Sequence, residues 1–208
     1  MGTKLRNFSI GFQTPYFCYM ANSLSVDQAL PKIRHYCSYQ ERCHQEVKEK
    51  LYGYGLRKND VELVISQLIE EDYLNEERFA RHFAGGKFRM KNWGRIRIQN
   101  ELKLRQVSDY CIRKAMKEIA DDDYQSAIEK LAAGRWETLK TEEVFLSRLK
   151  KTQDYLLYKG YEWELVQRQL QLLKINTKNE QPEYYDRSDH SPLGRKGKEP
   201  RDARDQDP

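Results

Sequence analysis

Apolar residues recur along this chain in three ladders with the same internal spacing. Each ladder has five apolar positions at offsets of 0, 5, 10, 14 and 17 residues, and successive ladders begin 51 and 54 residues apart. The last three positions of each ladder fall at i, i+4 and i+7, which places them on one face of a helix. This periodicity predicts a tandem helical repeat. The ladders are Leu51, Leu56, Val61, Ile65, Leu68; Leu102, Val107, Ile112, Met116, Ile119; and Leu156, Tyr161, Val166, Leu170, Leu173.

Residues that start helices divide the first repeat into three helices. The segment from Val26 to Cys37 predicts the first. Ser38 followed by Glu41 has the spacing of a capping box and predicts the start of the second helix. Asn59 with Glu62 three residues later predicts the start of the third.

The other two repeats follow the same order. In the second, Asn75 is expected to cap a helix with an acidic first turn, the sequence Asn92-Trp93-Gly94 to form a loop, and Ser108 to cap the last helix. In the third, helices are expected around residues 124–136 and 141–158 and from Gly160 to about Leu173. No strand-like alternation competes with these patterns.

The predicted fold is therefore all-α, with three tandem three-helix repeats that form an elongated curved rod. The ends of the chain differ in composition from its centre, because an aromatic segment precedes the first repeat and a tail of mixed charge follows the third. We expect five parts: an extension over residues 1–23 that is poorly ordered, repeats over 24–72, 73–120 and 121–174, and a disordered tail over 175–208.

Composition argues against several classes of function. The chain lacks the common nucleotide-binding, metalloprotease and hydrolase motifs, so we expect neither an enzyme nor a cofactor. Cys18, Cys37, Cys43 and Cys111 match no usual zinc or disulfide spacing. We expect no metal site, and we interpret Cys37 and Cys43 as small packing residues. A reducing cytoplasm fits this cysteine usage, and no stretch has the roughly 20 apolar residues of a membrane span.

The second repeat carries the strongest local charge bias. Between Arg78 and Arg105 there are nine basic residues and one acidic residue, Glu101. Such a surface attracts phosphates or an acidic protein groove, although a solvated helix face is the plain alternative. For Trp93 we favour packing in the loop, and for Arg78 an internal salt bridge and a partner contact are equally plausible. The candidate binding residues are Arg81, Lys87, Arg89, Lys91, Trp93, Arg95, Arg97, Lys103 and Arg105.

Several of these motifs together resemble the RecX family of recombination regulators. The resemblance covers residues 24–173 and is strongest in the second repeat. It is carried there by Tyr73-Leu74-Asn75-Glu76-Glu77-Arg78-Phe79-Ala80, Trp93-Gly94, Ile96 and Glu101-Leu102, with flanking matches at Ser38, Val47, Leu51, Gly55-Leu56, Tyr158-Lys159-Gly160-Tyr161, Val166 and Leu170.

Two positions depart from the family pattern. Arg95 stands where the family usually has proline after the Trp-Gly pair, and Gln106 stands where a glycine usually ends the helix. Proline presets φ and glycine accepts positive φ without strain, so these exchanges are expected to alter local turns. Neither removes an apolar ladder position, so the fold is expected to persist.

The resemblance implies a cytoplasmic protein, expected to be a monomer, that acts in recombination, DNA repair and the SOS response. It implies binding to the RecA recombinase, chiefly as a filament on single-stranded DNA, and modulation of its ATPase and strand exchange, usually downward. This interpretation leaves weak direct contact with DNA open. A helical module that binds single-stranded nucleic acid directly is one alternative. A helical scaffold for another partner is the second.

Overall fold

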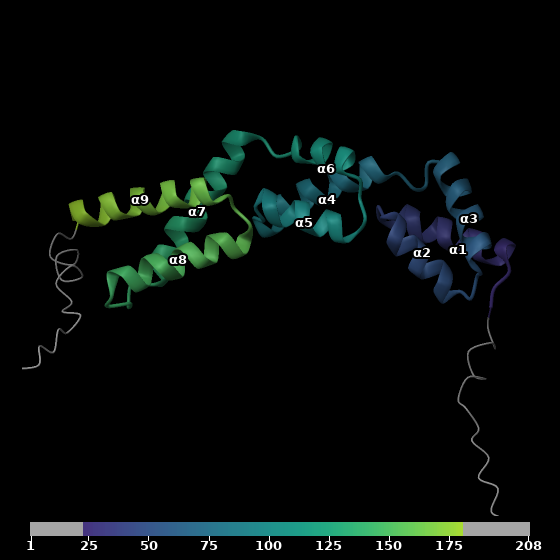
Figure 1. Ribbon diagram of the computed structural model, residues 1–208, viewed down its shortest axis with the longest axis horizontal. Helices are drawn as coiled ribbons and strands as arrows, with labels where there is room; N and C mark the ends of the chain where they lie inside the picture. Colours follow the sequence, from purple (N-terminus) through teal and green to yellow (C-terminus); the bar gives the residue numbers. More distant parts are fainter. Residues whose placement is uncertain (1–22, 181–208) are drawn as a thin grey trace, which may run out of the picture. The chain divides into compact units, whose positions relative to one another are not determined.

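The computed structural model describes residues 23–180, and this part of the chain contains nine α-helices and no strand (Figure 1). The all-α prediction is confirmed. Each predicted repeat contains three of the helices, which are α1 (Val26–Tyr39), α2 (His44–Gly53), α3 (Lys58–Glu70), α4 (Glu76–Lys91), α5 (Arg95–Leu104), α6 (Asp109–Met116), α7 (Asp121–Thr138), α8 (Phe145–Lys159) and α9 (Trp163–Glu180).

The described helices belong to two compact units. Of the described residues, the first unit holds 23–91 together with Ile98–Ile119, and the second holds Asn92–Arg97 together with 120–180. Within the first unit α1, α2 and α3 pack on one another and α4 packs along α6, while α7, α8 and α9 pack together in the second. The loop after α4 therefore belongs to the unit of the third repeat.

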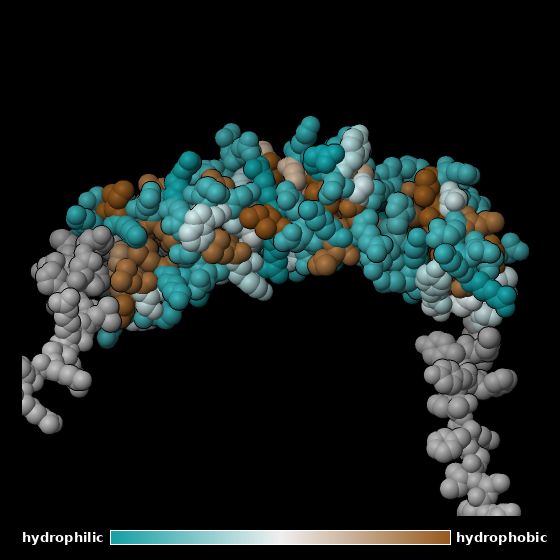
Figure 2. Space-filling view, viewed as in Figure 1, coloured by the Kyte–Doolittle hydropathy of each residue, from teal (hydrophilic) through white to brown (hydrophobic). Residues whose placement is uncertain are grey.

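The apolar ladders form the cores of the repeats, as their spacing predicted. Thirteen of the fifteen ladder residues are buried, and the other two, Met116 and Leu173, are half-buried. Burying such side chains contributes about 1.5–3 kcal/mol each. Outside the core the described surface is largely hydrophilic on the face drawn in Figure 2, in keeping with a chain in which 33% of residues are charged.

One turn geometry occurs in all three repeats. The amide of the second ladder residue donates to the carbonyl of the first, as in Leu56 to Leu51 at 3.3 Å, Val107 to Leu102 at 3.2 Å and Tyr161 to Leu156 at 3.3 Å. This is the Schellman pattern, in which the residue before the donor adopts a left-handed conformation. That residue is Gly55 (φ 82°), Gln106 (φ 58°) and Gly160 (φ 90°) in the three repeats.

Replacing Gln106 with glycine should therefore stabilise the first unit. A residue with a Cβ is strained at positive φ, and glycine is not, so we expect Gln106→Gly to add about 0.5–1 kcal/mol to the free energy of unfolding. The same exchange at Gln99, inside α5, should instead cost about 1 kcal/mol. Urea unfolding compares the two variants, and a loss of stability in Gln106→Gly would contradict the turn geometry.

Two predicted helix starts are wrong. α1 continues through Ser38, whose hydroxyl donates to the carbonyl of His35, and α2 begins later with Cys43 as its N-cap. α3 already begins at Lys58, so Asn59 lies inside the helix. The predicted caps Asn75 and Ser108 are confirmed, since their side chains accept amide hydrogen bonds of 3.0 Å and 3.4 Å.

Helix α9 is longer than the sequence indicated. It runs to Glu180, past residue 174, and Thr177 is buried with its hydroxyl donating to the carbonyl of Leu173. The remainder of the predicted tail and residues 1–22, with Cys18, lie outside the described residues. Between residues 23 and 180, no helix combines the length and the apolar composition that a membrane-spanning segment needs.

An unexpected cap ends α7. Arg148 of α8 is buried, and its Nε and Nη2 both donate to the carbonyl of Trp136, at 3.1 Å and 2.7 Å. Its guanidinium also lies 3.8 Å from the centroid of the Trp136 ring. A cation is favourable at a helix C-terminus, where carbonyls lack partners, so Arg148 fixes α8 against the end of α7.

Candidate interaction surface on helix α4

Helix α4 carries the first half of the basic run, and its own sequence sets its ends. Asn75 caps it, and Glu76 and Glu77 in the first turn complement the positive end of the helix dipole. Arg89 and Lys91 lie in the last turn, where cations are favoured. Asn92 follows with a φ of 50°, a conformation that asparagine tolerates better than most residues, and ends the helix.

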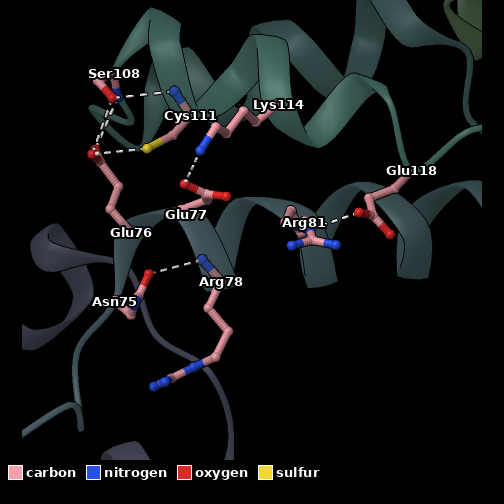
Figure 3. A network of polar contacts seen from close by, with 9 residues as sticks. All are labelled: Asn75, Glu76, Glu77, Arg78, Arg81, Ser108, Cys111, Lys114 and Glu118. Atoms are coloured by element: carbon pink, nitrogen blue, oxygen red, sulfur yellow. Dashed lines mark hydrogen bonds and ion pairs between the residues drawn. The ribbon is translucent and has the colours of Figure 1, made fainter.

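Two ion pairs join α4 to α6 and the residues that directly follow it (Figure 3). Lys114 Nζ lies 2.8 Å from Glu77 Oε2, and Arg81 Nε lies 2.6 Å from Glu118 Oε1. Glu77 and Arg81 are four residues apart, and so are Lys114 and Glu118. The two ion pairs therefore lie one helical turn apart along the contact between the two segments. The hydrogen bond to Glu77 raises the pKa of Lys114 above its usual value. Arg81, a predicted partner contact, thus has an internal partner.

Glu76 of α4 also caps the N-terminus of α6. Its carboxylate accepts hydrogen bonds from the Ser108 amide at 2.9 Å and the Ser108 hydroxyl at 3.1 Å, and its Oε2 lies 3.5 Å from Cys111 Sγ (Figure 3). A carboxylate is favourable at the N-terminus of α6 because unpaired amides point outward there. The acidic first turn of α4 therefore stabilises the N-termini of both α4 and α6.

Arg78 forms internal salt bridges. Its Nε donates to Glu41 at 2.7 Å, and its other nitrogens donate to the carboxylate and the carbonyl of Asp72, both at 2.8 Å. In Figure 3 its guanidinium extends to the side of α4 opposite α6. Of the two interpretations the sequence left open, the salt bridge is the one the structure contains. Arg78 ties the start of α4 to the first repeat.

Two grooves border α4, both within the first unit. Groove one is polar, and Arg89 reaches back along it so that a Cβ added to Gly85 would lie 2.8 Å from Arg89 Nη1. Groove two is less polar. Groove one is lined by Asn75, Glu77, Arg78, Arg81, His82, Arg89 and Glu118. Groove two is lined by Ser38, Tyr39, Gln40, Glu41, Glu46, Phe79, His82, Phe83, Gly86, Lys87, Met90, Lys91 and Arg105.

The predicted binding residues do not form one continuous site in the structure. Arg81 and Arg89 line groove one, while Lys87, Lys91 and Arg105 line groove two. Arg105 also pairs with Glu101 at 2.6 Å. Lys103 is exposed on α5 and lines neither groove.

Trp93 and Arg97 lie in the second unit. The Arg97 guanidinium lies 4.2 Å from the Trp93 ring and 4.7 Å from the Tyr158 ring, and its Nη1 donates to the Tyr158 carbonyl at 3.0 Å. Stacking of a guanidinium on aromatic faces is favourable. These contacts hold the loop after α4 on the end of α8.

Arg95 is also engaged inside the second unit. Its backbone amide donates to the Tyr124 hydroxyl at 3.0 Å, its guanidinium lies 4.3 Å from the Tyr124 ring, and its Nη2 lies 2.5 Å from Asp121 Oδ1. A proline at this position would remove that amide donor. The departure from the family pattern is therefore accompanied by contacts that proline cannot make.

The Tyr124 hydroxyl should contribute measurably to stability. Burial, and then the 2.7 Å hydrogen bond to Glu162, raise the pKa of this hydroxyl, so it stays protonated and donates to Glu162 at neutral pH. Tyr124→Phe leaves two part-buried groups unpaired and should cost about 1–3 kcal/mol in urea unfolding. Tyr158→Phe, at an exposed position, should change stability by less than about 0.5 kcal/mol. Equal effects would contradict this network.

Three residues that line groove two, Tyr39, Gly86 and Met90, do not stand out in the sequence as binding residues. Tyr39 and Met90 are 82% and 84% exposed, and Gly86 occupies the middle of an amphipathic helix. The adjacent glycines Gly85 and Gly86 were a usable signal, because glycine is disfavoured inside helices.

The cysteines next to α2 are buried apolar residues. Burial raises the pKa of the Cys37 thiol to about 11 and raises that of Cys43 as well, so both stay protonated at neutral pH. Among the described residues no three His, Cys, Asp or Glu side chains are grouped as metal ligands would be. Packing accounts for the Cys37 side chain, whereas Cys43 Sγ in addition accepts the Glu46 amide as the N-cap of α2.

Comparisons with known proteins show similarity to RecX proteins. The family model for the second three-helix domain of RecX matches residues 75–116, which span α4 to α6. The regulatory protein RecX of Shigella boydii is 31% identical over 148 residues, covering 66% of this chain and 87% of the relative. That of Lactococcus lactis is 26% identical over 148 residues, covering 70% of this chain and 55% of the relative.

A solved structure has the same fold. The crystal structure of RecX from Lactobacillus salivarius matches with a TM-score of 0.64 at 20% identity, covering 72% of this chain and 97% of that one. A second RecX crystal structure matches with a TM-score of 0.61 at 18% identity, covering 68% of this chain and 71% of that one.

Proposed function

Since the chain belongs to the RecX family of regulatory proteins, we propose that it regulates the RecA recombinase. It binds in the groove of the RecA filament on single-stranded DNA and lowers the ATPase and strand-exchange activities of that filament. The protein acts as a monomer in the cytoplasm, where this partner is found, and performs no catalysis of its own.

The observation that carries this proposal is the basic character of α4. Lys87, Arg89 and Lys91 follow one another along its last turns, and they line the two grooves described above. A filament on DNA offers both phosphates and protein carboxylates, and a row of cations attracts either. The three tandem repeats provide several surfaces, so contacts with more than one protomer would reinforce one another.

The mechanism requires binding energy and no chemistry. ATP turnover and disassembly both need RecA protomers to move relative to their neighbours, and a ligand that favours one arrangement shifts the filament toward it. A protein that contacts adjacent protomers would oppose these motions while bound. Our proposal places α4 toward the DNA-containing groove and the other repeats against RecA protein.

A second candidate function is direct binding of single-stranded nucleic acid. The same cations favour it, because phosphate contacts alone give appreciable affinity at low salt. It predicts that bare DNA binds as tightly as the filament and that affinity falls steeply with salt. A scaffold for another partner, the remaining alternative, predicts no binding to either.

Binding measurements separate these functions. The fluorescently labelled full chain is titrated with RecA filaments on single-stranded DNA and, separately, with the same DNA alone, at two salt concentrations. We expect filament affinity at least ~10-fold above that for bare DNA, equivalent to about 1.4 kcal/mol. Equal affinities would favour the nucleic-acid module and contradict the proposal.

A further inference from the structure

Groove two has the dimensions of a binding site. It lies between α4 and the end of α1 within the first unit and encloses about 670 Å³. Pockets that take ligands usually measure roughly 300–1,000 Å³. The groove is therefore large enough for side chains of a partner.

The apolar part of this groove is unusually accessible. The Phe79 and Phe83 rings lie 5.8 Å apart, and Phe83 is half-buried. Met90 and Tyr39 also line the groove, although more than four-fifths of each residue is exposed to solvent. Aromatic residues and methionine are enriched where proteins bind one another, and methionine adapts to irregular apolar partners. These side chains favour an apolar occupant.

The charges around the groove favour an occupant with carboxylates. Lys87 Nζ lies 5.1 Å and the Arg105 guanidinium 4.8 Å from the centroid of the Phe83 ring, so cations stand directly beside the apolar surface. Lys91 lines the same groove. Of the two carboxylates in the lining, Glu41 is bound by Arg78 at 2.7 Å and Glu46 lies 4.0 Å from Arg42. The two acidic lining residues thus have cations of their own, and Arg105 has Glu101 at 2.6 Å. Lys87 and Lys91 add positive charge to the lining, which favours a partner with carboxylates.

Gly86 keeps the wall of groove two open. It lies in the groove wall, and a Cβ added there would meet nothing within 4 Å. Glycine destabilises a helix interior relative to alanine, so an internal contact usually explains its presence. No such contact exists at Gly86, whereas at Gly85 the Arg89 guanidinium occupies the space of the missing side chain. The open space at Gly86 leaves room beside α4 for a bulky side chain of a partner.

We propose that groove two binds a protein segment in which a bulky apolar side chain is flanked by carboxylates. The apolar side chain packs on Phe83 and Met90 beside Gly86, and the carboxylates pair with Lys87 and Arg105. This inference rests on the proposed function, because it places the segment on the recombinase. It assigns groove two to protein and leaves phosphate contacts to other cations.

Filling the groove tests the proposal. We compare Gly86→Phe, which places a ring in the open space, with Gly86→Ala, which adds a single methyl group. Binding of the full chain to RecA filaments on single-stranded DNA should weaken at least ~10-fold in Gly86→Phe and stay within ~2-fold in Gly86→Ala. Circular dichroism melting checks that both variants fold. Unchanged binding of a folded Gly86→Phe would overturn the assignment of the groove.

A photo-crosslinker identifies the occupant. Benzoylphenylalanine at position 90, which is exposed, should form an adduct with RecA protein when the variant is irradiated on the filament. An adduct with DNA, or no adduct while the variant still binds, would overturn the proposal. Failure of the unmodified chain to bind filaments would instead overturn the proposed function, and with it the partner assigned here.

Discussion

Gly94→Ala should destabilise the second unit by at least about 3 kcal/mol. Gly94 donates its amide to the Lys159 carbonyl at 2.8 Å, and Ile96 donates to the Gly160 carbonyl at 3.1 Å. A Cβ at position 94 would overlap the carbonyl group of Gly160, which is backbone and cannot rotate away. Overpacking of a rigid contact forces the backbone apart, and here the two hydrogen bonds would be lost as well. Urea unfolding measures the loss.

Gly134→Ala is the matched control in the same unit. Gly134 lies inside α7, and a Cβ there meets nothing within 4 Å. The exchange removes a poor helix former, so it should stabilise the unit by about 0.5–1 kcal/mol. If both variants unfolded like the parent chain, the close approach of the Trp93-Gly94 loop to the turn at Gly160 would be wrong.

Reversing the charge of Lys87, Arg89 and Lys91 together should weaken filament binding at least ~100-fold, equivalent to about 2.7 kcal/mol. Each glutamate replaces an attraction to phosphate or carboxylate with a repulsion, and close charge pairs at interfaces couple strongly. Fluorescence titration of the Lys87→Glu/Arg89→Glu/Lys91→Glu variant against RecA filaments measures the change. The loss should shrink as salt is raised, because salt screens the remaining charges.

The control for this variant changes the net charge equally at other sites. Lys32, Lys58 and Lys130 are exposed on α1, α3 and α7. Reversing all three should alter filament affinity by less than ~3-fold, since none of them lines either groove beside α4. If the two triple variants bound equally weakly, total charge would explain the effect and α4 would have no special role.

The repeats could be predicted because they depend on local periodicity. The ladder residue Leu51 and its equivalents Leu102 and Leu156 are all fully buried, and the sequence also marked the caps Asn75 and Ser108. Several residues before each helix can act as a cap, and the choice depends on which one the packing places there. Cys43 therefore caps α2 although Ser38 and Glu41 have the better sequence pattern.

The run of basic residues from Arg78 to Arg105 could be predicted, but the assignment of its members to different units could not. Arg95 and Arg97 look in sequence like the cations of α4, yet their partners are Tyr124 and Tyr158, which lie 29 and 61 residues further along the chain. Local charge counts contain no information about such distant partners. The adjacent glycines mark position 86 in the sequence, but the open space beside it depends on how α1 and α4 are placed.

The RecA ATPase tests the central claim most directly. The single-stranded-DNA-dependent ATPase of RecA from the same organism is titrated with the full chain and with the Lys87→Glu/Arg89→Glu/Lys91→Glu variant. Our proposal predicts inhibition at amounts of the chain well below those of RecA, and loss of that inhibition in the variant. Inhibition only when the chain is abundant enough to coat the DNA, or no inhibition at all, would contradict it.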